Sequence, residues 1–275
     1  MPERALVVGA GPMGMWLASH LKRLGYRPVL HDIRPQSARR AASRLRCGWV
    51  SRLEDVERDT SVSFVAVGSE ASARVILKLA DILSAGSSVI DISSVKTPVA
   101  HGLRRLRRDI IVVFIHPLFG PGASGPAGRH VIFTPFRSPH QEEAVLKRFF
   151  GDAYILRLGY REHDLLMAYC MAVPRLVSLA LLHGWLRLNA LELTSSQRAI
   201  TAAAATTLSD SPKVFSEIVA LNPYTKKAVG DFLRSLQKYA IADRSALERD
   251  VRFVSRHIPR LDILYKKIYQ ILDNT

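Results

Sequence analysis

Short apolar runs rich in valine and isoleucine alternate with segments of helix length through the N-terminal half of the chain. Runs of this kind, separated by helix-length connections, are typical of buried parallel strands joined by crossover helices. The alternation therefore predicts a doubly wound α/β domain. The expected strands are residues 5–8, 28–31, 62–67, 88–92, 110–115, 130–134 and 153–158.

The β pattern stops after Gly159, and helical periodicity continues to the end of the sequence. A chain of 275 residues suffices for one full α/β domain and a smaller second one. We therefore expect an α/β domain over residues 1–159 and an all-helical domain over residues 160–275. The expected helices are 162–190, 195–208, 211–221, 224–240 and 244–272, the last kinked at Pro259.

The segment from Leu165 to Leu186 is almost entirely apolar and is long enough to cross a bilayer. Arg175 lies in the middle of it, where a charge is costly in lipid. A helix buried between two copies of a chain shows the same apolarity on all sides. We therefore expect no membrane span and a homodimer formed through the helical domain.

The formal net charge is +15, and arginine clusters supply much of it. Such a balance suits nucleic acid, but these clusters lack interleaved exposed aromatic residues for base stacking. No nucleic-acid partner is therefore expected. A basic surface equally suits an anionic cofactor and a small anionic substrate.

The two cysteines, Cys47 and Cys170, are far apart and match no metal-ligand spacing. Neither a disulfide framework nor a metal site is expected. No basic and apolar leader precedes the first expected strand, so no export signal is predicted. These features favour the reducing cytoplasm.

The run Gly9-Ala-Gly-Pro-Met-Gly14 follows directly on the first expected strand and leads into helical periodicity. In such a loop the first glycine permits a tight turn, the second lets the backbone approach a pyrophosphate, and the third lets helix and strand pack closely. Free N–H groups and the helix dipole then stabilise the phosphates. The pattern predicts a Rossmann domain that binds a dinucleotide. The loop residues expected to contact it are Gly9, Gly11, Pro12, Met13 and Gly14.

Asp32 closes the second expected strand, where a carboxylate accepts hydrogen bonds from both ribose hydroxyls and so favours NAD. Arg34 lies two residues on, and Arg39 and Arg40 follow, so pairing with the 2′-phosphate of NADP stays open. We predict NAD as the cofactor. The other expected cofactor contacts are Ile33 and Arg34, and Val67 and Gly68 after the third expected strand.

His116 ends an apolar run and precedes Pro117, which holds its backbone extended. An imidazole titrates near neutrality and takes the proton of a secondary alcohol as hydride leaves. Ser94 and Lys96 follow residues 88–92 in the same way, and strand ends meet at one edge of a parallel sheet. We predict these three as catalytic, with Lys96 as a fixed positive charge at an anionic site.

These motifs, followed by His163-Asp164 at the start of a helix, resemble the prephenate and arogenate dehydrogenases of tyrosine biosynthesis over about residues 4 to 225. The resemblance implies an NAD-dependent oxidative decarboxylation. It also implies that His116 contacts the ring hydroxyl of the substrate and that Ser94 helps place this hydroxyl and the nicotinamide. His163 is a candidate substrate contact, whereas Asp164 also suits the first turn of a helix on electrostatic grounds alone.

The sequence departs from the family pattern at two positions, where Arg175 replaces a histidine that holds substrate and Thr206 replaces an arginine that binds a substrate carboxylate. Either Arg175 supplies the carboxylate-binding fork from another helix, or the substrate differs, or Arg175 contacts the cofactor or a partner subunit. A dehydrogenase or reductase for another small acid and a catalytically inactive nucleotide-binding regulator are the alternative functions. Prephenate and arogenate are not distinguished.

Overall fold

The computed structural model describes residues 2–191, 194–208 and 211–272. The chain divides into two compact units, Met1–Met167 and Ala168–Thr275. The predicted division at residue 159 precedes helix α6 (Tyr160–Met167), which the structure includes in the first unit. This helix belongs there because His163 hydrogen-bonds to His116 of the sheet and Asp164 to Lys96, the residue that caps α4.

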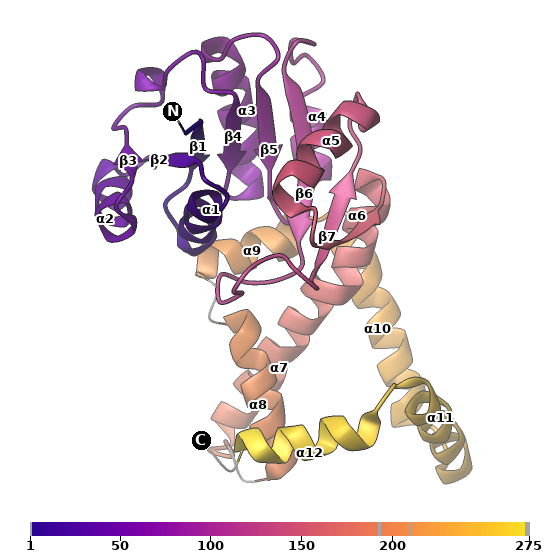
Figure 1. Cartoon of the computed structure of the whole chain (residues 1–275). Coiled ribbons are helices and arrows are strands. Elements are labelled where there is room, and N and C mark those ends of the chain that lie inside the picture. Colours follow the sequence, from indigo (N-terminus) through magenta and orange to yellow (C-terminus); the bar gives the residue numbers. More distant parts are fainter. Residues whose placement is uncertain (1, 192–193, 209–210, 273–275) are drawn as a thin grey trace. The chain divides into compact units, whose positions relative to one another are not determined.

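The first unit is built around a sheet of eight strands in the order β3-β2-β1-β4-β5-β6-β7-β8 (Figure 1). The order reverses at β1, whose neighbours are β2 and β4, and an open α/β sheet binds ligands at such a reversal. The strands are β1 (Arg4–Val8), β2 (Arg27–His31), β3 (Gly48–Trp49), β4 (Val62–Val65), β5 (Ser88–Asp91), β6 (Ile111–Pro117), β7 (His130–Thr134) and β8 (Tyr154–Arg157).

The doubly wound fold and each of the seven predicted strands are confirmed. The two-residue strand β3 was not predicted, because so short a strand leaves no apolar run to detect. The expectation of a wholly parallel sheet is wrong at one place, since β7 pairs antiparallel with β6. Residues 118–129 join these strands without a helix, and a parallel partner would need a longer crossover.

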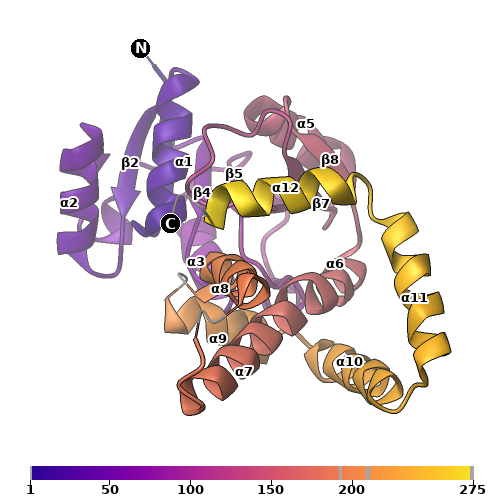
Figure 2. The same ribbon diagram turned by 90° about the horizontal axis from the view of Figure 1, so that it is seen from below.

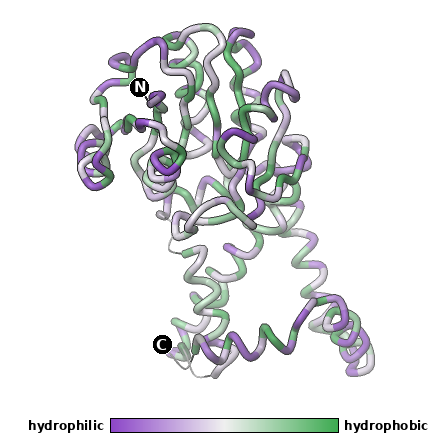
Figure 3. The backbone as a smooth tube through the Cα atoms, viewed as in Figure 1, coloured by the Kyte–Doolittle hydropathy of each residue, from purple (hydrophilic) through white to green (hydrophobic). Residues whose placement is uncertain are grey.

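Helices cover both faces of this sheet and bury alternate residues of its strands. Ala5 and Val7 of β1 pack with one layer of helices, whereas Leu6 and Val8 pack with the other. The first layer contains α1 (Pro12–Arg23), α2 (Pro35–Leu45) and α5 (Pro139–Phe150), and the second contains α3 (Ser69–Ile82) and α4 (Thr97–Gly102). Figure 3 shows the strands mainly in the hydrophobic colour and α2 mainly in the hydrophilic one.

The second unit is helical, as predicted. Its helices are a π-helical segment η2 (Ala168–Ala172), α7 (Val173–Arg187), α8 (Ser195–Leu208), α9 (Pro212–Ala220), α10 (Thr225–Ala240), α11 (Arg244–His257) and α12 (Leu261–Leu272). Within this unit α7 packs on α8, α9 and α10, and α12 packs on α8 (Figure 2). The predicted single helix over residues 244–272 is wrong: it ends before Pro259 and restarts after Arg260, which adopts a left-handed conformation.

Helix α6, η2 and α7 together run from Tyr160 to Arg187 and are long and apolar enough, by length and composition, to cross a membrane. The π-helical turn within this run immediately precedes Pro174, which lacks the N–H of a regular helical hydrogen bond. Large apolar side chains of the second unit are exposed in the isolated chain, on α7, α11 and α12. They include Leu179, Leu186, Val251, Phe253, Val254, Leu264 and Tyr265.

Candidate active site and cofactor loop

The loop between β1 and α1 requires its first and last glycines for its own packing. Gly9 has φ of +105°, and a side chain there would meet the Ala66 carbonyl oxygen at 2.4 Å. A Cβ on Gly14 would lie only 1.7 Å from the Gly9 carbonyl oxygen. These two positions admit no other residue without a shift of backbone, which explains the spacing of the motif.

Gly11, the middle glycine of the loop, is not required by the packing of the loop itself. A Cβ on Gly11 would meet no atom within 4 Å, so the space above it is open to a ligand. Gly11 is also the N-cap of α1 and offers no side chain to the N–H groups of the first helical turn. Pro12 begins the helix, and Met13 and Gly14 present their N–H groups there. This arrangement fits a pyrophosphate held by backbone N–H groups and the helix dipole.

Asp32 holds the glycine loop against the end of β2. Its Oδ2 accepts the Ala10 N–H at 2.9 Å, and its Oδ1 accepts the Arg34 N–H at 2.9 Å. The Arg34 guanidinium lies 3.8 Å from the same carboxylate and is largely exposed. Each carboxylate oxygen has a second lone pair, so the contacts leave room for the predicted ribose hydrogen bonds.

The remaining predicted cofactor contacts lie at the same edge of the sheet. Ile33 is 91% exposed, which is unusual for an isoleucine and leaves its side chain available to a ligand. Val67 and Gly68 are half-buried between β4 and α3, and Gly68 caps that helix. Because β1 and β4 are neighbours, both segments border the glycine loop.

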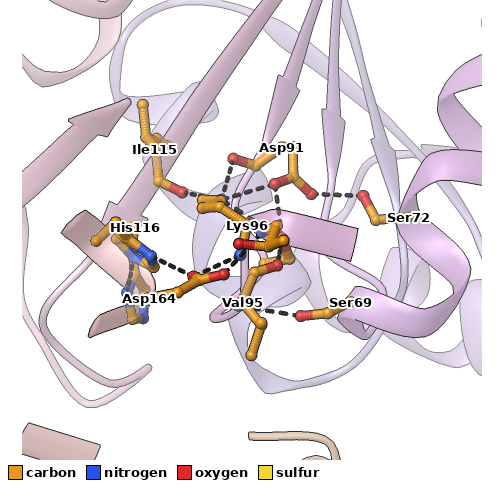
Figure 4. Close-up of polar contacts among 11 residues, drawn as sticks. Ser69, Ser72, Asp91, Val95, Lys96, Ile115, His116 and Asp164 are labelled. Carbon is orange, nitrogen blue, oxygen red and sulfur yellow. Dashed lines mark hydrogen bonds and ion pairs between the residues drawn. The ribbon is translucent and has the colours of Figure 1, made fainter. Parts of the chain in front are cut away.

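Lys96 is completely buried, and its ammonium group is enclosed by acceptors from two strand ends (Figure 4). Its Nζ donates to Asp91 Oδ2 at 2.6 Å and to the Ile115 carbonyl at 2.8 Å. Asp91 also accepts hydrogen bonds from Ser72 and Ser93. Burial lowers the pKa of Lys96, and the Asp91 charge opposes this shift. The enclosed ammonium does not suit the predicted role of an open charge at an anionic site, because Asp91 already compensates it.

His116, at the end of β6, forms a chain of hydrogen bonds with the first residues of α6. Its Nδ1 lies 3.0 Å from His163 Nε2, and His163 Nδ1 lies 2.8 Å from Asp164 Oδ1. The Asp164 oxygens also accept the N–H groups of Lys96 at 2.8 Å and Thr97 at 2.7 Å. All three side chains of this chain are buried.

The order of donors and acceptors in this chain fixes the position of each imidazole proton. An ionised carboxylate only accepts hydrogen bonds, so His163 Nδ1 carries a proton and donates a hydrogen bond to Asp164. Neutral His163 then has a lone pair at Nε2, which accepts a hydrogen bond from the Nδ1–H of His116. His116 in its neutral form is thereby left with an unprotonated Nε2, the atom that a general base requires.

The electrostatics of the buried pair support this assignment. Burial lowers the pKa of His163, although Asp164 acts in the opposite direction. Burial alone would raise the pKa of Asp164, but hydrogen bonds from His163, Lys96 and Thr97 bring it below its usual value. Asp164 is therefore ionised and His163 neutral near pH 7, as the chain of hydrogen bonds needs.

The structure brings together most of the site residues expected in the first unit. Ser94 is half-buried beside Lys96 in the turn after β5. Arg175 lies on α7 in the second unit, where it is 6% exposed and one guanidinium nitrogen donates to the Met171 carbonyl at 3.3 Å. The Thr206 hydroxyl donates to the Ala203 carbonyl of its own helix at 2.7 Å.

Two positioning residues were underestimated by the sequence. Asp164 was assigned to the helix dipole alone, yet it links α6 to α4 and orients His163. Asp91, at the end of β5, neutralises the buried ammonium of Lys96. The adjacency of Asp164 to His163 was the available signal, since a carboxylate next to an imidazole commonly fixes its tautomer.

The family model described as "Prephenate dehydrogenase, nucleotide-binding domain" matches residues 17–150 of the chain. A curated relative, the "Probable arogenate/prephenate dehydrogenase" of Methanocaldococcus jannaschii, is 20% identical over 183 residues. That match covers 64% of this chain and 41% of the relative, so the chain spans less than half of the relative's length.

Solved structures share the fold. The prephenate dehydrogenase from A. aeolicus, in complex with hydroxyphenyl propionate and NAD+, superposes with a TM-score of 0.76 at 23% identity, over 96% of this chain and 99% of that one. The Synechocystis arogenate dehydrogenase gives a TM-score of 0.65 at 22% identity, over 98% and 99%. At these identities the likeness establishes the fold. The sequence match makes residues 17–150 similar to the nucleotide-binding domain of prephenate dehydrogenases.

Proposed function

We propose that the chain is a nicotinamide-dependent dehydrogenase that catalyses the oxidative decarboxylation of prephenate or arogenate. The observation that carries this proposal is the chain of hydrogen bonds from Asp164 through His163 to His116, which prepares an imidazole lone pair at the carboxyl edge of the sheet. The glycine loop reaches the same edge and fits a dinucleotide. A nicotinamide dinucleotide, when bound, supplies the hydride acceptor.

In the proposed reaction, His116 Nε2 accepts the proton of the ring hydroxyl as the carbon bearing it loses hydride. The bond to the departing carboxylate breaks, its electron pair enters the ring, and carbon dioxide and an aromatic ring result. His163 accepts a hydrogen bond from the Nδ1–H of His116 throughout and so stabilises the imidazolium that forms. Ser94 is proposed to orient the hydroxyl. Lys96 and Asp91 hold the β5 and β6 ends in register.

A reduction assay tests this proposal most directly. The full chain is mixed with prephenate or arogenate and with NAD or NADP, and formation of the reduced cofactor is followed by its absorbance. Turnover of either substrate supports the assignment and identifies which side chain, keto or amino, is accepted. Lack of turnover with both substrates would restrict the assignment to a dinucleotide-binding fold.

Arg175 is proposed to bind a carboxylate of the substrate. Replacing Arg175 with alanine should raise KM strongly. Truncating one partner of a buried charge pair typically costs about 2–5 kcal/mol of binding free energy. Dinucleotide affinity, measured by titration, should stay unchanged. An unaltered KM would assign Arg175 to another role, and Thr206→Ala serves as the control because its hydroxyl bonds within its own helix.

We also propose that the protein is a cytoplasmic homodimer joined through its helical unit. Large apolar side chains are exposed on α7, α11 and α12, and large exposed apolar patches usually mark interaction sites. A second copy would cover this surface. Sedimentation velocity should show a dimer at micromolar concentrations, and cell fractionation should recover the protein in the soluble fraction. A stable monomer or partition into membranes would contradict the proposal.

One observation favours a second candidate function. The position expected to supply a carboxylate-binding arginine is Thr206, whose hydroxyl is engaged within α8. A dehydrogenase of the same architecture that acts on another small acid fits this departure. Screening small hydroxy acids for cofactor reduction separates it from the first candidate.

A further inference from the structure

A cavity of about 660 Å³ opens beside the glycine loop. Ala10 of the loop forms part of its wall, and α2 supplies most of the remainder. The residues of α2 that matter here are Ser37, Arg39, Arg40 and Arg44. The cavity therefore joins the predicted cofactor loop to α2, whose backbone is drawn mainly in the hydrophilic colour in Figure 3.

The charge of this cavity is uncompensated. Its lining includes three arginines and no carboxylate. Within residues 2–191, 194–208 and 211–272, the guanidinium groups of Arg39, Arg40 and Arg44 take part in no hydrogen bond or ion pair. Arg40 and Arg44 also lie one helical turn apart, where two like charges destabilise a helix. Bound anionic charge would relieve this repulsion.

The start of α2 adds to the same field. Arg34 is its N-cap, and its first turn has no acidic residue, although carboxylates are favoured there. The potential at the start of α2 is thus positive from three sources: the helix dipole, Arg34 and the three arginines of the cavity. A phosphate group matches this environment in charge and in its capacity to accept several guanidinium hydrogen bonds.

The cavity lies next to the carboxylate that would bind the adenosine ribose. Ala10, in the cavity wall, donates its N–H to Asp32 Oδ2. A substituent on the 2′ oxygen of a ribose held at Asp32 would therefore enter the cavity. Asp32 alone disfavours such a phosphate, but two backbone N–H groups and Arg34 offset its charge.

We propose that this arginine cavity holds the 2′-phosphate of NADP, so that the chain binds NADP at least as tightly as NAD. The inference rests on the proposed function only in taking a nicotinamide dinucleotide as the cofactor. Arg40 and Arg44 are the specificity-determining residues, and Arg39 and Ser37 complete the phosphate site.

The experiment is an isothermal titration of the full chain, without substrate, with NADP and NAD and with two fragments that lack nicotinamide, 2′-phospho-ADP-ribose and ADP-ribose. Arg40→Ala and Arg44→Ala should each weaken NADP and the phosphorylated fragment by roughly tenfold, and the double variant by roughly a hundredfold. Affinity for NAD and ADP-ribose should change by less than about twofold. Arg105→Ala, which removes an exposed arginine elsewhere in the first unit, is the matched control and should change neither.

The outcomes separate this inference from the proposed function. NADP binding more than tenfold weaker than NAD binding would overturn the inference and leave the dehydrogenase assignment intact. Equal losses for both cofactors in the arginine variants would also overturn it, because the arginines would then contact a group that both share. Selective, arginine-dependent NADP binding without turnover of prephenate or arogenate would support the cavity and reject the proposed reaction.

Discussion

Replacement of His116 with alanine should lower kcat by about a hundredfold or more, the loss expected when a general base is removed. The reason is that the hydrogen bonds with His163 and Asp164 place the imidazole proton of His116 on Nδ1, so that Nε2 carries the lone pair. Dinucleotide affinity should be retained, since the glycine loop lies on other strands. Steady-state kinetics with each substrate, together with a cofactor titration, measures both quantities.

Two variants of His163 distinguish proton placement from simple packing. Leucine removes the acceptor for the His116 Nδ1 proton, so kcat should fall by about ten- to a hundredfold because the wrong tautomer of His116 becomes populated. Glutamine places an amide oxygen near the position of Nε2 and should restore part of this loss. Equal kcat values for the leucine and glutamine variants would show that His163 acts only by filling space.

Burial of His163 also makes the stability of the fold depend on pH. Because burial places the folded pKa of His163 below the value of about 6.5 for a solvated imidazole, the unfolded chain binds the proton first as the pH falls. The free energy of unfolding should therefore decrease as the pH drops below about 6.5 and approaches the folded pKa. His163→Gln should weaken this dependence by the part that His163 contributes, while buried His20 keeps its own, as urea titrations over a pH series would reveal.

Much of the site was predictable because its residues follow strands. The carboxyl ends of parallel strands share one edge, so the sequence predicts that His116 and Lys96 lie together. The contact of Asp164 with Lys96 and Thr97 was not predictable, since it links residues 68 and 67 positions apart through the packing of α6 on α4. Burial of Lys96 was not predictable for a similar reason. Lysine is almost never fully buried unless it is paired with an acidic group, and the residues beside Lys96 in the sequence do not show which carboxylate pairs with it.

The errors in the fold have local causes. The loop at residues 118–129 contains four glycines and two prolines and lacks helical periodicity, which was evidence against a crossover helix and hence against a parallel β7. Pro259 predicts a kink where the structure has a break between α11 and α12. A proline kinks or ends a helix depending on whether the following residues can continue it, and Arg260 instead adopts φ of 57°.

Replacement of Lys96 with methionine should destabilise the chain by about 3–5 kcal/mol, because it leaves the Asp91 carboxylate buried without its counter-charge. Methionine fills a similar volume, so the loss comes mainly from the charge. Lys147→Met is the matched control: its ammonium also pairs with a carboxylate, Glu143 at 2.8 Å, but Lys147 is largely exposed and Glu143 only half-buried. Its cost should stay below about 1 kcal/mol.

A second substitution at Asp91 isolates the pairwise part of this effect. In the double variant Asp91→Asn with Lys96→Met no buried charge is left uncompensated, and the asparagine oxygen can still accept a hydrogen bond from a neighbouring serine. The double variant should therefore be more stable than the sum of the two single losses predicts, by an interaction energy of about 1–3 kcal/mol. Urea unfolding of the unmodified chain, the two single variants and the double variant gives this interaction energy by a double-mutant cycle. Strict additivity would mean that the ammonium is tolerated rather than required, and that the ends of β5 and β6, with His116 beside them, are held in place by the sheet alone.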